Sequence, residues 1–128
     1  MSDTSIQPDA FLKACPSRDL LRVLGGKWAP LVLVALDGGP QRFGALRRRV
    51  EGVTQKMLTQ TLRQLQRAGL VERRAYDELP LRVEYTLTPL GQSALPPVRA
   101  LKTWAQTHFE ESVSAQAEFD ARYGAPNP

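Results

Sequence analysis

A repeat of leucines in a mostly polar stretch, residues 54–68, constrains the fold of this 128-residue chain more than any other feature. Leu58, Leu62 and Leu65 follow one another at spacings of four and three, which places them on one face of an α-helix. Thr54 has the side chain of a good N-cap at the start of this helix. The pattern predicts a helix with one buried face and one face of amides, hydroxyls and cations.

Three shorter helices are expected ahead of this one. The first starts at Pro16 and ends at the glycine pair 25–26. Residues 28–36 are hydrophobic nearly all round, which is typical of a buried helix. Residues 43–50 are expected to form a short third helix with its apolar side chains on one face.

A β-hairpin is expected after the leucine helix, because residues 70–76 and 82–87 alternate in strand fashion around a polar turn. Thr88-Pro89 then has the chemistry of a helix start, and we expect Pro96-Pro97 to interrupt that last helix. A short helix, a tight turn, an amphipathic helix and a basic hairpin together describe a mainly α winged helix-turn-helix with a small β-hairpin wing.

The chain length suits one domain with two tails. We expect a flexible N-terminal arm over residues 1–14, the winged helix-turn-helix with its dimerisation helices over 15–112, and an acidic C-terminal tail over 113–128. Residues 41–82 hold ten basic and four acidic side chains, a net charge of +6. A basic middle indicates a surface that binds a polyanion, although a solvated arginine-rich surface would have the same composition.

Composition also disfavours several classes of protein. One Cys and one His argue against a zinc site built from those ligands, and a lone thiol forms no internal disulfide. No apolar run approaches the roughly 20 residues of a membrane span, and residues 1–10 lack the apolar core of a signal peptide. The sequence has no glycine-rich phosphate loop and no nucleophile elbow. We therefore expect a cytoplasmic protein that is not an enzyme and holds no metal or cofactor.

The polar face of the leucine helix is the candidate for reading DNA, since a major groove about 12 Å wide admits one helix. Gln and Arg can make bidentate contacts with adenine and guanine edges, and threonine methyl groups can touch thymine. The alternative is an ordinary solvated helix face. The groove-facing candidates are Thr54, Gln55, Lys56, Thr59, Gln60 and Arg63.

Arginines on either side of this helix are candidates for backbone and minor-groove contacts. Arg47 and Arg48, in the cluster just before it, would position the protein on phosphates. Arg74 and Arg82 lie on the hairpin, and Arg82 is the better placed to enter a narrow minor groove, which attracts arginine. Arginines of the cluster could instead pair with nearby glutamates, and such surface pairs add little stability.

An apolar stripe in the last helix, formed by Val98, Leu101, Trp104 and Phe109, indicates a partner surface. In a chain this small, part of the stripe is expected to stay uncovered within one subunit, and an exposed stripe marks a contact surface. A two-fold dimer would place two recognition helices in successive major grooves of a palindrome, roughly 34 Å apart. Alternatively, this helix closes the core of a monomer.

Cys15 lies just before Pro16 at the start of the first helix, with Lys13 and Arg18 close in the sequence. A helix N-terminus and nearby cations lower the pKa of a thiol, and the thiolate is the reactive form. A redox-sensing role is one interpretation of this position. The other is a small buried apolar residue, which describes most free cysteines.

Short motifs follow one another in a specific order along residues 15–108. They include Cys15-Pro16, Leu24-Gly25-Gly26-Lys27-Trp28, Gly39-Pro40-Gln41-Arg42-Phe43, Lys56-Met57-Leu58-Thr59-Gln60, Gly69-Leu70-Val71 and Arg82-Val83-Glu84-Tyr85. As an ordered set they resemble the HxlR-type winged helix-turn-helix transcriptional regulators. Gln55 departs from the family pattern, in which many relatives have proline.

The resemblance implies a homodimer built from the first and last helices, with Leu20 in its interface. It implies binding to an inverted-repeat operator near a promoter, and we expect a repressor. It also implies that Cys15 senses oxidants or electrophiles. Because the chain has no second cysteine, such a switch would need a Cys15 bridge between two copies, or an adduct with a small thiol or electrophile.

Two alternatives remain open at this point. One is a winged-helix regulator without thiol sensing, either constitutive or controlled by a small ligand. The other is a protein-interaction module that has lost DNA binding.

Overall fold

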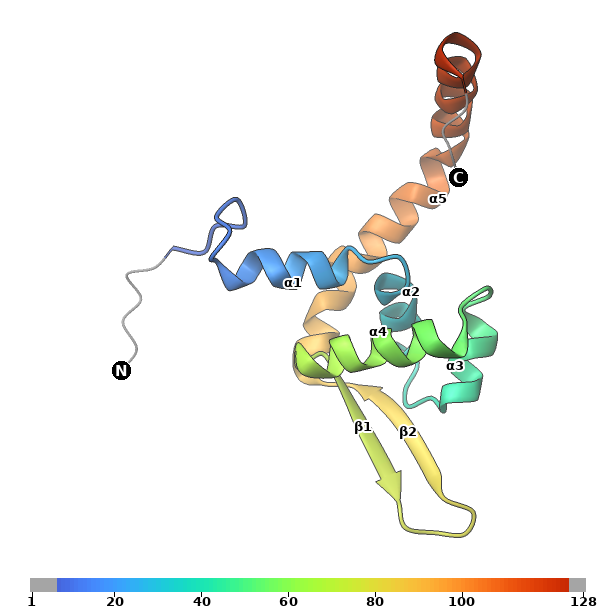
Figure 1. Cartoon of the computed structure of the whole chain (residues 1–128). Coiled ribbons are helices and arrows are strands. Elements are labelled where there is room, and N and C mark those ends of the chain that lie inside the picture. Colours follow the sequence, from blue (N-terminus) through green and yellow to red (C-terminus); the bar gives the residue numbers. More distant parts are fainter. Residues whose placement is uncertain (1–6, 125–128) are drawn as a thin grey trace.

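The computed structural model describes residues 7–124, which form five helices and one β-hairpin. Figure 1 shows how these elements are arranged. This architecture confirms the expected winged helix-turn-helix, mostly helical with a two-stranded antiparallel wing. The elements, in chain order, are α1 (Pro16–Leu24), α2 (Ala29–Ala35), α3 (Phe43–Arg49), α4 (Gln55–Arg67), β1 (Val71–Tyr76), β2 (Arg82–Leu87) and α5 (Pro89–Tyr123).

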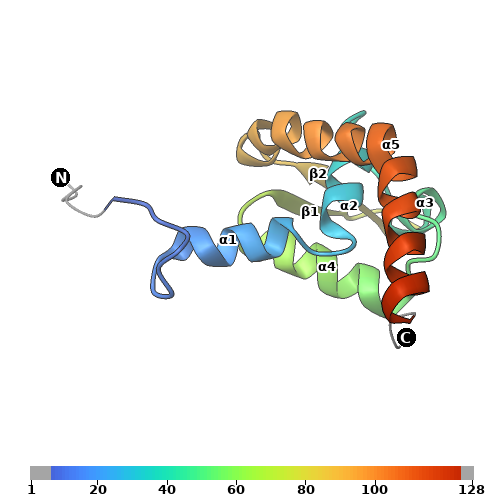
Figure 2. The ribbon, with the colours of Figure 1, turned by 90° about the horizontal axis from the view of Figure 1, so that it is seen from above.

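The core is centred on α2, which lies between α4 and α5 (Figure 2). Because α2 is apolar nearly all round, it can bury Val32 and Leu33 completely while packing against several neighbours. The leucine stripe of α4 closes the core from one side, and Leu95 of α5 closes it from the other. The short helices are therefore held by shared burial, since helices of this length are marginal by themselves.

The wing has a regular register in which Val71 pairs with Leu87 and Tyr76 pairs with Arg82. Its base is buried, and its far end extends away from the helices (Figure 1). Gln41, just before α3, exchanges two backbone hydrogen bonds with Tyr85, at 2.9 and 2.8 Å. These bonds tie the wing to the helix-turn-helix unit as a short third strand would.

The expected interruption of the last helix at Pro96-Pro97 is wrong, because α5 continues through both prolines to Tyr123. The two prolines lack the N–H groups that would bond the carbonyls of Gln92 and Ser93. Both of these residues are exposed, so water can reach the freed carbonyls. Leu95 and Val98, on either side of the prolines, are buried and hold the helix against the body.

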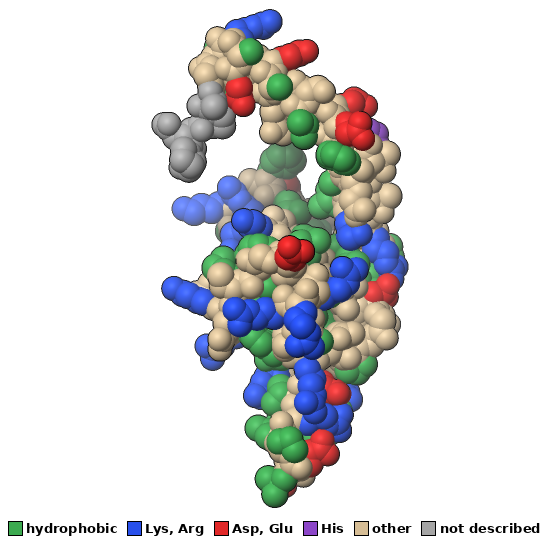
Figure 3. Space-filling model, turned by 90° about the vertical axis from the view of Figure 1, so that its right-hand side faces the viewer, with side chains coloured by type: hydrophobic (Ala, Val, Ile, Leu, Met, Phe, Trp, Pro, Cys, Tyr) green, Lys and Arg blue, Asp and Glu red, His purple; other side chains and the backbone are tan. Residues whose placement is uncertain are grey.

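The C-terminal half of α5 stands clear of the body and curves over it (Figure 3). Residues 113–123, which belong to the expected acidic C-terminal tail, lie within this helix. Val98 was expected on the partner surface, but it is only 6% exposed and belongs to the core of its own chain. The expectations for residues 1–6 and 125–128 lie outside the described residues.

Candidate nucleic-acid interface

The two faces of α4 differ as the leucine repeat predicts. Leu58, Leu62 and Leu65 are 0–1% exposed, and they dock the helix on the core. The opposite face lies open on the surface. All six groove-facing candidates on it are exposed, namely Thr54, Gln55, Lys56, Thr59, Gln60 and Arg63. Whether these side chains contact bases stays a prediction.

Local chemistry fixes where α4 begins. The Thr54 hydroxyl accepts a hydrogen bond from the backbone N–H of Met57 at 3.1 Å, which confirms Thr54 as the N-cap. The turn before it needs Gly52, whose φ of +91° lies in the left-handed region that favours glycine. Val50 and Val53 are buried on either side of this glycine. The turn is therefore anchored, and α4 leaves it in a defined direction.

An open hollow lies beside this turn, and α3 lines it with Arg47 and Arg48. Both guanidinium groups are exposed, and Figure 3 shows Lys and Arg side chains gathered over this face and along the wing. Within residues 7–124, neither of them pairs with an acid, and the same holds for Arg63. These three cations are therefore available to phosphates or bases.

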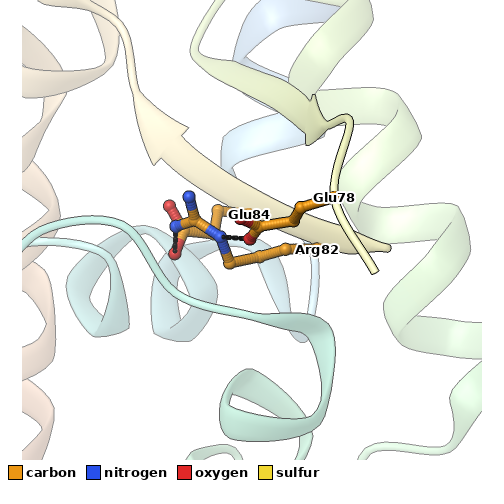
Figure 4. A network of polar contacts seen from close by, with 3 residues as sticks. All are labelled: Glu78, Arg82 and Glu84. Carbon is orange, nitrogen blue, oxygen red and sulfur yellow. Dashed lines mark hydrogen bonds and ion pairs between the residues drawn. The ribbon is translucent and has the colours of Figure 1, made fainter. Parts of the chain in front are cut away.

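The two wing arginines expected to contact DNA, Arg74 and Arg82, are engaged within the chain. Arg82 lies between two carboxylates, with its Nε 2.6 Å from Glu78 and its Nη1 2.9 Å from Glu84 (Figure 4). Its guanidinium also stacks over the ring of Tyr76, 3.8 Å from the ring centre. Arg74 similarly donates to Glu72 at 2.5 Å. The prediction that Arg82 enters a minor groove stands untested, and such entry would require exchanging these partners for DNA.

The ion pair between Arg82 and Glu84 was not predicted from the sequence, although the alternation of residues along the strand indicates it. Alternate residues of a strand share one face, so Glu84 lies on the same face as Arg82. Thr61 was also missed as a core residue. It is buried beside the leucine stripe, and its hydroxyl donates to the Met57 carbonyl at 2.8 Å.

A family model described as HxlR-like helix-turn-helix matches residues 23–113 of this chain. The chain belongs to the HxlR-like helix-turn-helix family.

Relatives of this HxlR-like chain are transcriptional regulators. It is 42% identical to the HTH-type transcriptional regulator YtfH of Escherichia coli over 84% of this chain and 86% of YtfH. The solved structure of ytfH from Salmonella typhimurium has a TM-score of 0.80 and 38% identity, covering 87% of this chain and 99% of that one. The HxlR-like chain is thus a transcriptional regulator with a helix-turn-helix DNA-binding fold.

Two further structural neighbours are HypR and YodB. The redox regulator HypR in its oxidized form has a TM-score of 0.68 and 39% identity, covering 73% of the HxlR-like chain and 96% of its own. Diamide-treated YodB of Bacillus subtilis has a TM-score of 0.64 and 31% identity, covering 75% of the HxlR-like chain and 96% of YodB.

Cys15 of the HxlR-like chain is half-buried at the N-cap position of α1. The Ser17 hydroxyl, 3.1 Å from the sulfur, holds the pKa of the Cys15 thiol below its usual value. The backbone N–H of Asp9, at 3.4 Å, lowers this pKa further, whereas the Asp9 carboxylate opposes the effect. Hydrogen bonds therefore cause the lowering, and not the cations Lys13 and Arg18 that the sequence suggested.

The expected interface residues lie mostly on the surface of this chain. Leu101, Trp104 and Phe109 of α5 are 55–62% exposed, and Leu20 of α1 is partly exposed. No helix among residues 7–124 combines the length and the apolar composition needed to cross a membrane.

Proposed function

We propose that this HxlR-like chain works as a homodimer that binds an inverted-repeat operator and represses transcription. The observation that carries the proposal is the outer face of α4, which is exposed and presents amides, hydroxyls and an unpaired Arg63. At about 1.5 Å per residue, its 13 residues make a helix of roughly 20 Å, which fits along a major groove. A dimer seated beside a promoter would block polymerase, so repression is the expected outcome.

A second copy would cover the apolar stripe of α5 that one chain leaves exposed. Leu101, Trp104 and Phe109 are large apolar side chains of α5, and each is more than half exposed. Burying them against a partner gains roughly 25 cal/mol for each Å² of apolar area removed from water. A two-fold axis through such a contact presents two α4 helices to one duplex.

Selection from a randomised duplex library tests this proposal. The expected product is an inverted repeat, with hydroxyl-radical footprints whose centres lie about one helical turn apart, roughly 34 Å. Because phosphate contacts release counterions, binding should also weaken steeply as salt rises. The proposal is contradicted if the folded protein enriches no sequence and its binding to DNA changes little with salt. That result would favour a protein-interaction module.

We further propose that Cys15 gives this regulator a thiol input. The lowered pKa of Cys15 supports a reactive thiolate, and HypR, a structural neighbour, is described as a redox regulator. Diamide would take two electrons and two protons from the Cys15 thiols of two copies, leaving one disulfide between them.

The variant Cys15→Ser tests the thiol input. We expect diamide to weaken operator binding by the wild-type protein, dithiothreitol to restore it, and Cys15→Ser to bind equally with and without oxidant. Gel electrophoresis without reductant should show a cross-linked dimer for the wild type alone. If Cys15→Ser loses DNA binding under diamide as the wild type does, the thiol input is excluded.

A further inference from the structure

We propose that a groove between α1 and α4 binds a small carboxylate with an apolar body, as an input to DNA binding that is independent of Cys15. The groove is a hollow of about 310 Å³ between α1 and the C-terminal end of α4. The two helices lie side by side there in both ribbon views (Figures 1 and 2). Its volume is at the lower end of the range of about 300–1,000 Å³ that is typical of small-molecule sites.

The lining of this α1–α4 groove suits a ligand that is part apolar and part anionic. Leu20 and Val23 of α1, together with Ala68 just after α4, provide apolar surface. Arg67 and Gln64 of α4 provide hydrogen-bond donors in the same hollow. A mostly apolar pocket with a few polar groups is the usual form of a site that selects one small molecule.

The charges in the groove favour a carboxylate. Two arginines and one acid line it, and the acid, Asp19, is paired with Arg22 at 3.0 Å, which leaves the positive charge of Arg67 in excess. Arg67 pairs with none of the acids in residues 7–124. A guanidinium can hold a carboxylate through two parallel hydrogen bonds, and this geometry is among the stronger ones in proteins. Arg67 is therefore the cation that an incoming carboxylate would meet.

A second hollow of about 150 Å³ adjoins the first, because Val23 and Gln64 line both. Trp28 lines this second hollow, and its indole Nε1 is buried without a hydrogen-bond partner among the described residues. A buried donor without an acceptor costs free energy, so a ligand that reaches it with an oxygen would gain affinity. Lys27 also lines this second hollow, and its ammonium, 4.8 Å from the centre of the Trp28 ring, adds positive charge there.

A ligand in the groove would touch two elements that the proposed function needs. Val23 is the one buried residue of α1, so little burial within one chain holds α1 in its position. The α4 wall of the α1–α4 groove includes Gln64. Gln64 lies one helical turn beyond Gln60, which is a candidate for contacts in the DNA major groove. A ligand held between the helices would change the position of α1 relative to α4, and hence the spacing of two α4 helices in a dimer. This coupling rests on the proposed function, whereas the binding does not.

Titration of the full-length ¹⁵N-labelled protein with benzoate tests the site without DNA. We expect saturable shifts of the Val23, Gln64 and Ala68 amides and of the Trp28 indole N–H, and none for the exposed Trp104 indole. Benzamide, which has the same ring without the charge, should bind about tenfold or more weakly. Arg67→Gln should weaken benzoate binding to a similar extent. Two control variants should bind benzoate with the affinity of the wild type. They are Cys15→Ser and Arg18→Gln, a change in α1 outside the groove lining.

The absence of saturable shifts overturns the proposal, as does equal binding of benzoate and benzamide. A weaker dimer for Arg67→Gln by sedimentation, without benzoate binding to the wild type, would show that a second copy fills the groove and would also overturn it. If benzoate binds, operator titrations with and without benzoate then test the coupling. The coupling requires that benzoate change the operator affinity of the wild type and leave that of Arg67→Gln unchanged. A chain that binds benzoate but no DNA would overturn the proposed function alone.

Discussion

The arginines of the candidate interface differ in what they would give up on binding DNA. Arg47, Arg48 and Arg63 are exposed and pair with none of the acids in residues 7–124. Arg82 would exchange contacts with Glu78 and Glu84 for contacts with DNA. Surface ion pairs are weak, so the exchange is possible, but it reduces the net gain. At the scale of single residues, we therefore expect α4 to contribute more to sequence preference than the wing tip.

The environment of Cys15 yields a prediction for its reactivity at different pH values. Since the Ser17 hydroxyl is the main cause of the lowered pKa, Ser17→Ala should raise the pKa of the thiol. The thiolate is the form that reacts, so the curve of iodoacetamide rate against pH should move to higher pH in the variant. Arg18→Ala is the matched control. An unchanged curve for Ser17→Ala would show that this hydrogen bond does not govern the thiol.

At the scale of elements, α4 and the hairpin could be predicted because their signals are local. The cap at Thr54, the leucine spacing and the strand alternation each lie within one segment. The continuity of α5 could not be predicted, because Pro96-Pro97 is a local signal for a break. What overrides it is the packing of Leu95 and Val98 on distant parts of the chain. The α1–α4 groove is similarly invisible in the sequence, since its walls lie some 40 residues apart.

One joint sets the position of the wing relative to α4. The Thr88 hydroxyl donates to the Gly69 carbonyl at 2.6 Å and accepts from the Gly91 N–H at 3.0 Å. The Thr88 N–H bonds the Leu70 carbonyl at 3.1 Å. Gly91 packs so closely there that a Cβ would lie 2.0 Å from the Leu70 carbonyl oxygen. The start of α5 is therefore locked to the end of α4 and to the base of β1.

Gly91→Ala tests this joint. We expect a loss of about 1–3 kcal/mol in the free energy of unfolding, because the added methyl group must displace backbone, and this outweighs the higher helix propensity of alanine. The measurement is urea denaturation followed by circular dichroism. Gly38→Ala is the control, since a Cβ at Gly38 meets nothing within 4 Å, and it should change stability by less than about 0.5 kcal/mol. Equal stability of Gly91→Ala and wild type would refute the close approach.

At the scale of the whole molecule, the surfaces proposed for DNA and for a second copy lie on different elements. In Figure 1 the wing extends from one end of the body, and the C-terminal half of α5 projects from the other. Val113, Phe119 and Tyr123 extend the exposed apolar side chains of α5 beyond Phe109. A dimer built on this part of α5 would therefore leave both wings free to approach one duplex.

The most direct test of the claim that α4 reads base edges is fluorescence-anisotropy titration of the selected operator with Arg63→Ala. Each half-site should lose roughly 1–3 kcal/mol of binding free energy through one base pair, so the full repeat should lose about twice that. The preference for one base over the others at that position should also become weaker. Arg122→Ala removes the same charge at the end of α5 and should bind and discriminate as the wild type does. If Arg63→Ala keeps the full affinity and the full preference at every base pair of the repeat, α4 does not read the operator through Arg63 and the central claim fails.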